Sequence, residues 1–180
     1  MKMKKTTYLV QSENQERVLE DVRIFLADSI YDYPRHDEWY RGIMREFSEG
    51  FDREMIVAYD GKQIAGVSIL KRSPMEKKIC SLRVAKEYRG NGLGTALFKR
   101  SLDYLETDKP ILTVSQNKRD EFQKIFKYFG FSLERVYPGK YRAGLNEYCY
   151  NGILLPENIL KQKENGLGMY LNSRVPKGFY

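Results

Sequence analysis

The 180-residue chain contains one histidine, two cysteines and no apolar run of the roughly 18 residues that a membrane span requires. His36 and the two cysteines do not form a ligand cluster, which excludes a structural zinc site. A serine or cysteine hydrolase is disfavoured, because His36 is the single histidine that could act as base. The first ten residues are basic but lack an apolar signal core, so we expect no secretion signal and a cytoplasmic location.

Length and composition are those of one soluble globular domain. The hydrophobic share of 42% and the charged share of 31% are ordinary for this class, which sets fibrous and disordered classes aside. Cys80 and Cys149 fall inside apolar, strand-like runs. We expect buried free thiols there, and a disulfide between them is the alternative.

The net charge is +7 and the sequence pI is near 9.3. This balance favours acidic partners, among them a phosphate-bearing cofactor, RNA or an acidic protein. No RNA-binding signature is present and the lysines are scattered, which favours a solvated basic surface. Nucleic acid is therefore the lesser alternative as a partner, and no membrane partner is expected.

The segment with the clearest chemistry is LRVAKEYRGNGLGTAL, residues 82–97. The apolar run that ends at Val84 predicts a strand, and the pattern beyond the glycines predicts a helix. Between them lie Gly90, Gly92 and Gly94, whose backbone N–H groups no side chain covers. The first N–H groups of a helix lack partners, and the helix dipole adds partial positive charge there. The segment therefore predicts a pocket for phosphate oxygens.

The spacing of this loop excludes two common nucleotide motifs. The dinucleotide fingerprint G-x-G-x-x-G needs a glycine at Thr95, and no P-loop string occurs. The segment instead resembles the acetyl-CoA-binding motif of the GCN5-related N-acetyltransferases (GNAT), L-x-V-x-P-x-x-R-G-x-G-[IL]-G. The matching positions are Leu82, Val84, Arg89, Gly90, Gly92, Leu93 and Gly94. Lys86 stands in the proline place, and a glycine-rich turn without a ligand is the alternative.

The order of the predicted elements also resembles that family. Strands are predicted at 6–11, 53–59, 63–71, 78–85, 111–115, 131–137 and 147–154, and helices at 14–30, 38–49, 92–106 and 118–129. The strands at 78–85 and 111–115 should be parallel, since a helix connects them. The expected fold is α/β (α+β), a mixed central sheet of about seven strands flanked by about four helices in a single domain. That domain spans residues 1–154, and residues 155–180 are a C-terminal extension of unknown role.

Three glycines have predicted backbone roles. Asp60-Gly61 predicts a hairpin turn, and Gly66 inside a strand predicts a close backbone approach. Gly130 predicts the cap of the last helix.

The resemblance implies acetyl-CoA as cofactor, with its pyrophosphate held by the loop. The implied binding residues there are Arg89, Gly90, Asn91, Gly92, Leu93, Gly94 and Thr95. The two central parallel strands would splay apart, and the pantetheine would pair with the backbone near Leu82, Arg83 and Val84. The Val84 N–H would polarise the thioester carbonyl. The implied reaction is direct attack of a small-molecule or peptide amine on the thioester.

Two positions depart from the pattern of the family. Many members carry a tyrosine four residues before a Gly-Phe pair, as general acid to the thiolate. That place is Phe126 here, which leaves the acid unassigned. Arg119 stands in the place of an asparagine that contacts the cofactor in many members. The helical spacing predicts that Tyr128 points about 200° away from Phe126 and cannot replace it.

The base that deprotonates the amine has only weak candidates in the sequence. Glu76 precedes the central strand, and its distance from Gly90 resembles that of the base glutamate in the histone-modifying branch of the family. The alternative is that Met75–Lys78 forms a solvated turn. The further carboxylate candidates are Glu147, Asp37 and Glu38. His36 stands at a predicted helix start, which indicates capping or packing.

Aromatic residues gather around the first inter-helix turn: Tyr31, Tyr33, Trp39 and Tyr40. They predict either an aromatic acceptor cleft or a core patch. Two other functions stay open at this point. Phe126 suggests an acyl-CoA-binding module without catalysis, and the basic charge suggests an acetyltransferase that acts on an RNA-borne amine. The sequence indicates neither the acceptor nor the oligomeric state.

Overall fold

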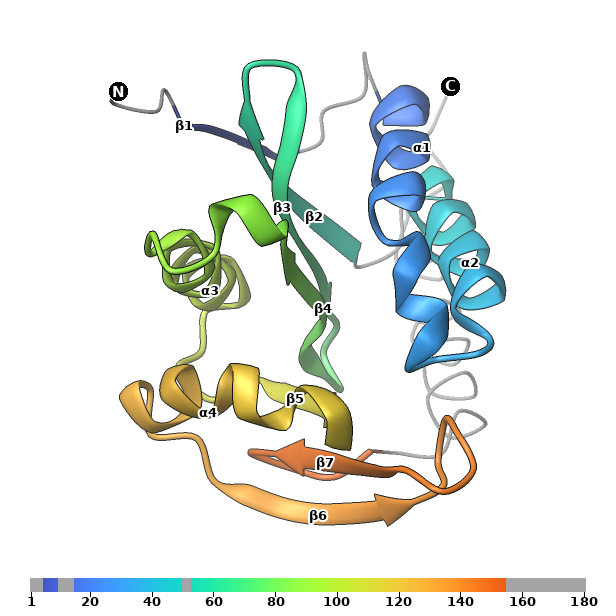
Figure 1. The fold of residues 1–180 in the computed structure, drawn as a ribbon, viewed down its shortest axis with the longest axis vertical. Coiled ribbons are helices and arrows are strands. Elements are labelled where there is room, and N and C mark those ends of the chain that lie inside the picture. Colours follow the sequence, from blue (N-terminus) through green and yellow to red (C-terminus); the bar gives the residue numbers. More distant parts are fainter. Residues whose placement is uncertain (1–4, 10–14, 50–52, 155–180) are drawn as a thin grey trace, which may run out of the picture.

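A seven-stranded sheet in the order β1-β2-β3-β4-β5-β7-β6 forms the centre of the molecule (Figure 1). The computed structural model describes residues 5–9, 15–49 and 53–154. The strands are β1 (Lys5–Leu9), β2 (Arg53–Asp60), β3 (Gln63–Arg72), β4 (Lys77–Val84), β5 (Ile111–Ser115), β6 (Leu133–Pro138) and β7 (Asn146–Tyr150). Only β4 and β5 pair in parallel, and the other neighbours are antiparallel. The predicted mixed sheet and its parallel pair are confirmed.

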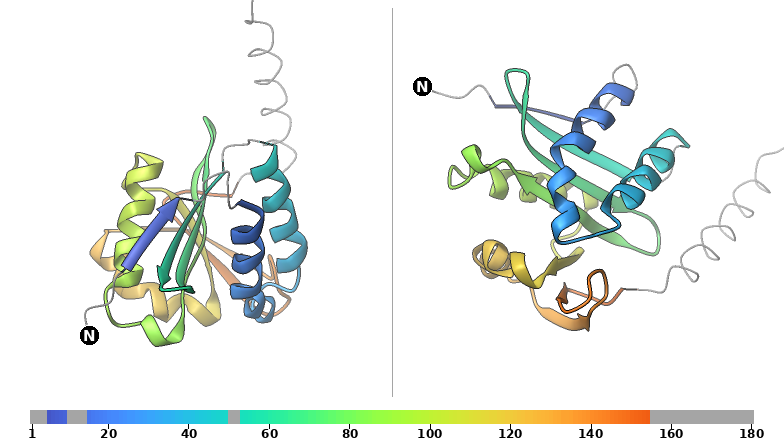
Figure 2. Two further views of the ribbon diagram at one scale, coloured as in Figure 1. Left: turned by 90° about the horizontal axis from the view of Figure 1, so that it is seen from above. Right: turned by 45° about the vertical axis from the view of Figure 1, so that its right-hand side comes forward.

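Helices cover both faces of the sheet (Figure 2). They are α1 (Gln15–Phe25), α2 (His36–Ser48), α3 (Leu93–Leu105) and α4 (Arg119–Tyr128), with short 3₁₀ turns η2 (Ala27–Tyr31), η3 (Lys86–Tyr88) and η4 (Gln116–Lys118). The first two helices pack on one face and the last two on the other. Among the described residues, no helix is long and apolar enough to cross a membrane.

The apolar run Met55-Ile56-Val57-Ala58 in β2 shows how a single strand contributes side chains to two hydrophobic cores. Met55 and Val57 pack in the cluster under α1 and α2, and Ile56 and Ala58 pack under α3. Side chains alternate along a strand, so a strand buried on both faces is apolar at successive positions. The sheet therefore separates two hydrophobic cores. A ligand that reaches the centre of the molecule has to enter at a gap between strands.

Several predicted boundaries shift. The helix predicted at 14–30 is wrong in its last turn, because the α-helix ends at Phe25 and η2 follows. The Ser29 N–H donates to the Leu26 carbonyl, three residues back, which is a 3₁₀ bond. The strand predicted at 147–154 ends at Tyr150, because Asn151 adopts a positive φ of 60°. The extension at 155–180 and two residues of the strand predicted at 6–11 lie outside the described residues.

The predicted roles of the glycines are confirmed. A Cβ on Gly66 would lie 2.8 Å from the Leu97 side chain and 3.1 Å from the Arg83 carbonyl, so β3 passes close to α3 there. Gly130 follows α4 with φ +64°. Cys80 and Cys149 are free thiols, as expected.

Candidate functional site

The parallel strands β4 and β5 are joined along only part of their length. They pair at Lys78 with Ile111 and at Ile79 with Leu112. From Cys80 to Val84 and from Thr113 to Ser115 the two strands do not pair with each other, and we call the gap between them the seam. It lies at the centre of the sheet, between the half that ends in β4 and the half that begins with β5 (Figure 1).

The backbone register decides which groups face the seam. The Ala85 N–H donates to a carbonyl of β3 at 2.9 Å. Residues of an antiparallel pair alternate between bonding their partner strand and facing away, so Val84 and Leu82 turn their N–H groups toward the seam. The Arg89 side chain donates to the outward-facing Val84 carbonyl at 3.2 Å. By the same alternation, the Arg83 backbone faces β3.

The glycine loop follows β4 and the short turn η3, and it leads into α3. Gly90 and Gly92 adopt φ of +75° and +78°, the left-handed region that glycine tolerates best. A Cβ on either would have no described atom within 4 Å, so the loop is bare on its outer side. Gly92 is the N-cap of α3, and Leu93, Gly94 and Thr95 form its first turn, where N–H groups have no intrahelical partner. The residues present therefore fit a phosphate-bearing ligand.

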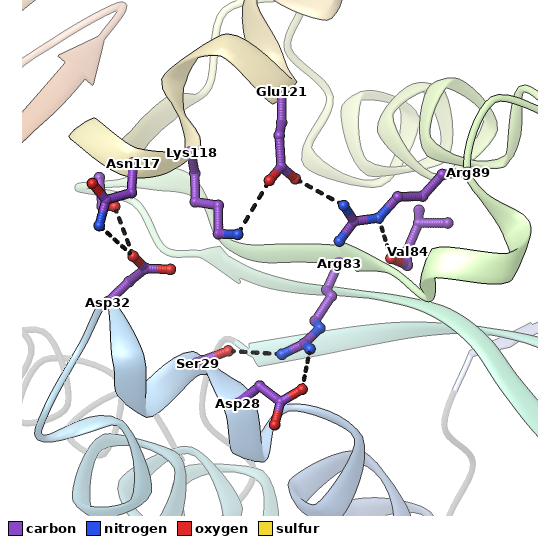
Figure 3. Close-up of polar contacts among 10 residues, drawn as sticks. Asp28, Ser29, Asp32, Arg83, Val84, Arg89, Asn117, Lys118 and Glu121 are labelled. Atoms are coloured by element: carbon purple, nitrogen blue, oxygen red, sulfur yellow. Dashed lines mark hydrogen bonds and ion pairs between the residues drawn. The ribbon is translucent and has the colours of Figure 1, made fainter.

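Charged side chains surround the mouth of the seam on the α3 and α4 side. Arg89 and Lys118 both contact the Glu121 carboxylate, at 3.3 Å and 3.1 Å, from opposite sides of the gap (Figure 3). All three side chains are about half exposed. Two cations are thus placed beside the bare loop, and the single carboxylate that contacts both offsets only one of their two charges.

The η2 turn crosses the opposite side of the seam. On the β4 side, Arg83 donates to Asp28 at 3.0 Å and to Ser29 at 3.4 Å (Figure 3). On the β5 side, Asp32 accepts from Asn117 at 3.2 Å (Figure 3). The connection between α1 and α2 therefore links the two halves of the sheet.

A buried carboxylate lies where this connection meets β5 and β7. The Glu147 carboxylate accepts from the Tyr33 hydroxyl at 3.3 Å, and that hydroxyl accepts from the Ser115 N–H at 3.1 Å. Glu147 is 3% exposed. Burial raises the pKa of its carboxyl from 4.5 to about 7, although hydrogen bonds from Thr113 and Tyr33 act in the opposite direction. Burial also raises the pKa of the Tyr33 phenol, which therefore stays protonated.

A family model described as Acetyltransferase (GNAT) domain matches residues 14–146, well over half of the sequence. The chain belongs to the GNAT acetyltransferase family. A search of curated proteins finds no match. Acetyl-CoA is the cofactor of this family, and the bare glycine loop fits its phosphates.

Solved structures share the fold of this acetyltransferase. A GNAT-family acetyltransferase from Bacillus cereus is 14% identical, with a TM-score of 0.57, over 81% of this chain and 94% of that chain. Naa50 from Arabidopsis thaliana, in complex with the bisubstrate analogue CoA-Ac-MVNAL, is 20% identical, with a TM-score of 0.58, over 81% and 96%. A chimera of the Vibrio cholerae spermidine N-acetyltransferase and hSSAT is 17% identical, with a TM-score of 0.54, over 81% and 94%.

Glu76 lies at the paired end of β4 in the acetyltransferase, not beside the seam. It belongs to the turn between β3 and β4, where its N–H donates to the Ser73 hydroxyl at 3.0 Å. Its side chain is 4% exposed and lies 3.6 Å from the Lys71 ammonium. The solvated turn is therefore wrong for Glu76, which is buried and paired. Its proposed role as base stays an untested prediction, and its position favours a structural role.

Phe126 is buried and Tyr128 is not. Phe126 is 4% exposed, with its ring centroid 4.2 Å from that of Tyr150 on β7. Tyr128 is 69% exposed and stacks under the Lys99 ammonium. The predicted register of α4 is confirmed, and Tyr128 points away from the side of the helix that Phe126 occupies.

The core patch is confirmed for two of the four aromatic residues, and an acceptor cleft stays a prediction. Tyr40 and Trp39 belong to the core, and the Tyr40 hydroxyl donates to the Leu19 carbonyl at 2.8 Å. Tyr33 reaches Glu147, while Tyr31 is exposed. His36 is buried beside Trp39, and burial lowers its pKa, as the packing role predicts. It is the first residue of α2, and its neighbour Arg35, not His36, holds the cap position.

Sequence reasoning placed Glu147 among several candidates without preference and missed its partner. One signal was available: in the strand Asn146–Tyr150, Glu147 shares a face with Cys149, an apolar position. A charged residue on a buried strand face is rare unless it is paired or functional. Tyr33 lies 114 residues away, and its contact with Glu147 could not be read from spacing.

Proposed function

We propose that this acetyltransferase moves the acetyl group of acetyl-CoA to the amine of a small molecule or peptide, and that Glu147 accepts the amine proton. Acetyl-CoA supplies the acetyl group as an activated thioester. The amine would attack from the side of the sheet that α1 and α2 cover. The cofactor would occupy the other side, where the glycine loop lies.

The observation that carries this proposal is the buried Glu147 carboxylate at the β5 side of the seam. A general base works best when its pKa is near the operating pH, and burial brings that of Glu147 to about 7. Glu147 lies opposite Ser115, at the end of β5 that does not pair with β4. Tyr33 would orient the carboxylate, because it is fixed at the same time by the Ser115 N–H.

The backbone of β4 would supply the other half of the chemistry. The Val84 N–H faces the seam, where it would donate to the thioester carbonyl as oxygen gains charge. The Leu82 N–H would hold the pantetheine arm by the same alternation. Cofactor contacts at Arg89, at the loop glycines and at Asn91 stay predictions, and the open space over Gly90 and Gly92 supports them.

An amine acceptor is supported by the relatives as well as by the site. One structural neighbour is a spermidine N-acetyltransferase chimera, and another binds an analogue that joins CoA to the peptide MVNAL. Small-molecule and peptide amines are therefore the two acceptor classes to test first. The Tyr33 ring, whose hydroxyl contacts Glu147, also packs edge-on against the Tyr141 ring, with the two centroids 5.6 Å apart.

The experiment measures thiol release from acetyl-CoA with spermidine, other amines and short peptides. Glu147→Gln should lower kcat/KM by about 10²- to 10³-fold and remove the rise in activity as pH passes about 7. Glu38→Gln, at an exposed carboxylate paired with Arg35, is the matched control and should behave as wild type. Wild-type rates in Glu147→Gln would contradict the assignment, and loss of activity in Glu76→Gln alone would return the role to Glu76.

A test of the cofactor site runs in parallel by calorimetry with coenzyme A. Gly92→Val should weaken binding, because a β-branched residue resists φ near +78° and its side chain would fill the space over the loop. Unchanged affinity in a folded variant would show that the cofactor binds elsewhere. The alternative function, acyl-CoA binding without catalysis, is favoured by Phe126; coenzyme A affinity without thiol release for any acceptor would support it.

A further inference from the structure

Acetyl transfer releases a thiolate, and the buried face of α4 offers no phenol to protonate it. Phe126 has no hydroxyl, and Tyr128 points to solvent. We propose that Tyr150 of β7 donates the proton to the departing sulfur. This inference rests on the proposed acetyl transfer, but its test below does not need an acceptor.

The strand β7 carries side chains to both sides of the sheet. Glu147 reaches Tyr33, which comes from the α1–α2 connection. Tyr150, three residues on, packs on the opposite side in the cluster formed by α3 and α4. Side chains that differ by an odd number of residues on a strand point to opposite faces. One strand thus supplies a base on the acceptor side and a phenol on the cofactor side.

The hydroxyl of Tyr150 lies beneath the first turn of α4. The Arg119 Nε donates to it at 3.5 Å, and the same guanidinium covers the Tyr148 ring at 4.5 Å from its centroid. Arg119 directly follows η4, whose Asn117 and Lys118 border the seam (Figure 3). The Tyr150 backbone pairs with Leu112, where β4 and β5 are still joined, and its side chain reaches from the Phe126 ring to the Arg119 guanidinium beside η4.

The proton of this phenol is available. Arginine has donors and no acceptor, so the Tyr150 oxygen accepts from Arg119 while its own hydrogen is directed elsewhere. Within the described part of the chain, no acceptor takes that hydrogen. The Arg119 guanidinium also fixes the position of the Tyr150 oxygen, so that the hydroxyl hydrogen points away from Arg119.

Other phenols near the seam are less well placed. Tyr33 lies on the acceptor side, where it contacts Glu147. Tyr148 shares the face of Tyr150 but is covered by the Arg119 guanidinium. Tyr148 is therefore the natural comparison for an experiment.

The proton inventory of the step balances. The amine nitrogen bonds to the carbonyl carbon, the carbon–sulfur bond breaks, and its electron pair goes to sulfur. Glu147 takes one proton from the nitrogen, and Tyr150 gives one proton to the sulfur. Glu147 then returns its proton to water, and Tyr150 recovers one from water. The products are the acetylated amine and the free thiol of coenzyme A.

The test measures the ionisation of the coenzyme A thiol while it is bound to the protein, by thiolate ultraviolet absorbance across pH. A phenol that donates to the thiolate stabilises it, so loss of the hydroxyl should raise the thiol pKa by about one to two pH units, the size of one charge-assisted hydrogen bond. We expect this shift in Tyr150→Phe and none in Tyr148→Phe. The double variant Phe126→Tyr/Tyr150→Phe should recover part of the shift, because it returns a phenol to the neighbouring ring position.

Steady-state kinetics provide the second readout once an acceptor is found. Tyr150→Phe should lower kcat by about 10²-fold, at the lower end for a general acid because a thiolate leaves readily. An unshifted thiol pKa in Tyr150→Phe, or a shift in Tyr148→Phe instead, would overturn the proposal. If Tyr150→Phe does not fold, Arg119→Gln replaces it: a thiol pKa that stays at the wild-type value there would also overturn the proposal. Failure of the proposed function would appear in a different measurement, the acceptor assay, in which the wild-type protein would transfer acetyl to none of the amines.

Discussion

The substitution Glu147→Gln should make the protein more stable at neutral and alkaline pH while it removes the proposed base. Glu147 is 3% exposed, and its charged form is disfavoured by burial. Glutamine has the same shape without the charge, and its amide oxygen can still accept from the Tyr33 hydroxyl. Stability and activity should therefore move in opposite directions at this one position.

The magnitude follows from the pKa of the carboxyl in the two states. Burial raises the pKa from 4.5 to about 7. Between these values the folded protein keeps a proton that the unfolded chain has released, so the free energy of unfolding falls as pH rises. One pKa unit corresponds to about 1.4 kcal/mol, which gives a loss of about 3 kcal/mol in the wild type between about pH 4.5 and above pH 7. Glu147→Gln has no such group and should lack this loss.

The assay is urea unfolding of both proteins at several pH values from about 5 to about 8.5. The difference in unfolding free energy should grow in favour of Glu147→Gln as pH rises, and level off above about pH 7. Glu38→Gln serves as control, because Glu38 is exposed and the hydrogen bond from Arg35 lowers its pKa. A difference that is independent of pH, or one that favours the wild type at high pH, would refute the burial argument and with it the assignment of the base.

Three further predictions concern other parts of the molecule. Gly66→Ala should lower stability by about 1–3 kcal/mol, because its Cβ would collide with the Leu97 side chain and a β4 carbonyl; an unchanged melting temperature would contradict the close approach. Glu121→Gln should raise coenzyme A affinity roughly two- to thirtyfold at low salt, because it frees Arg89 and Lys118 from two exposed ion pairs worth about 0.2–1 kcal/mol each; weaker binding in calorimetry would show that Glu121 supports the site. Removal of residues 155–180 should leave coenzyme A affinity unchanged, and a folded truncated protein that no longer binds it would place the extension in the site.

The cofactor side of this acetyltransferase is mostly local in sequence. Strand, glycine loop and helix start follow one another within residues 82–97, so spacing and residue type suffice to predict a phosphate cradle. The same holds for α4, where a period of 3.6 residues correctly separates buried Phe126 from exposed Tyr128. The role of Gly66 was also predicted, because a glycine inside an apolar strand indicates that another part of the chain approaches its backbone closely.

The acceptor side depends on contacts that only the folded chain brings together. Tyr33 meets Glu147 across 114 residues, and Arg119 meets Tyr150 across 31. The pKa of a carboxyl depends on burial and on neighbouring charges, which sequence spacing does not report. Glu76 and Glu147 were therefore both candidates for the base in the sequence. In the structure Glu76 lies beside Lys71, and Glu147 lies beside the seam. The sequence by itself determined a bare glycine loop followed by a helix start and so predicted a phosphate site there, because such a site needs only the backbone N–H groups of one continuous segment. The tertiary structure alone decided which carboxylate and which phenol lie back to back near the centre of the sheet, because β7 joins the sheet beside β5 and carries one to each face.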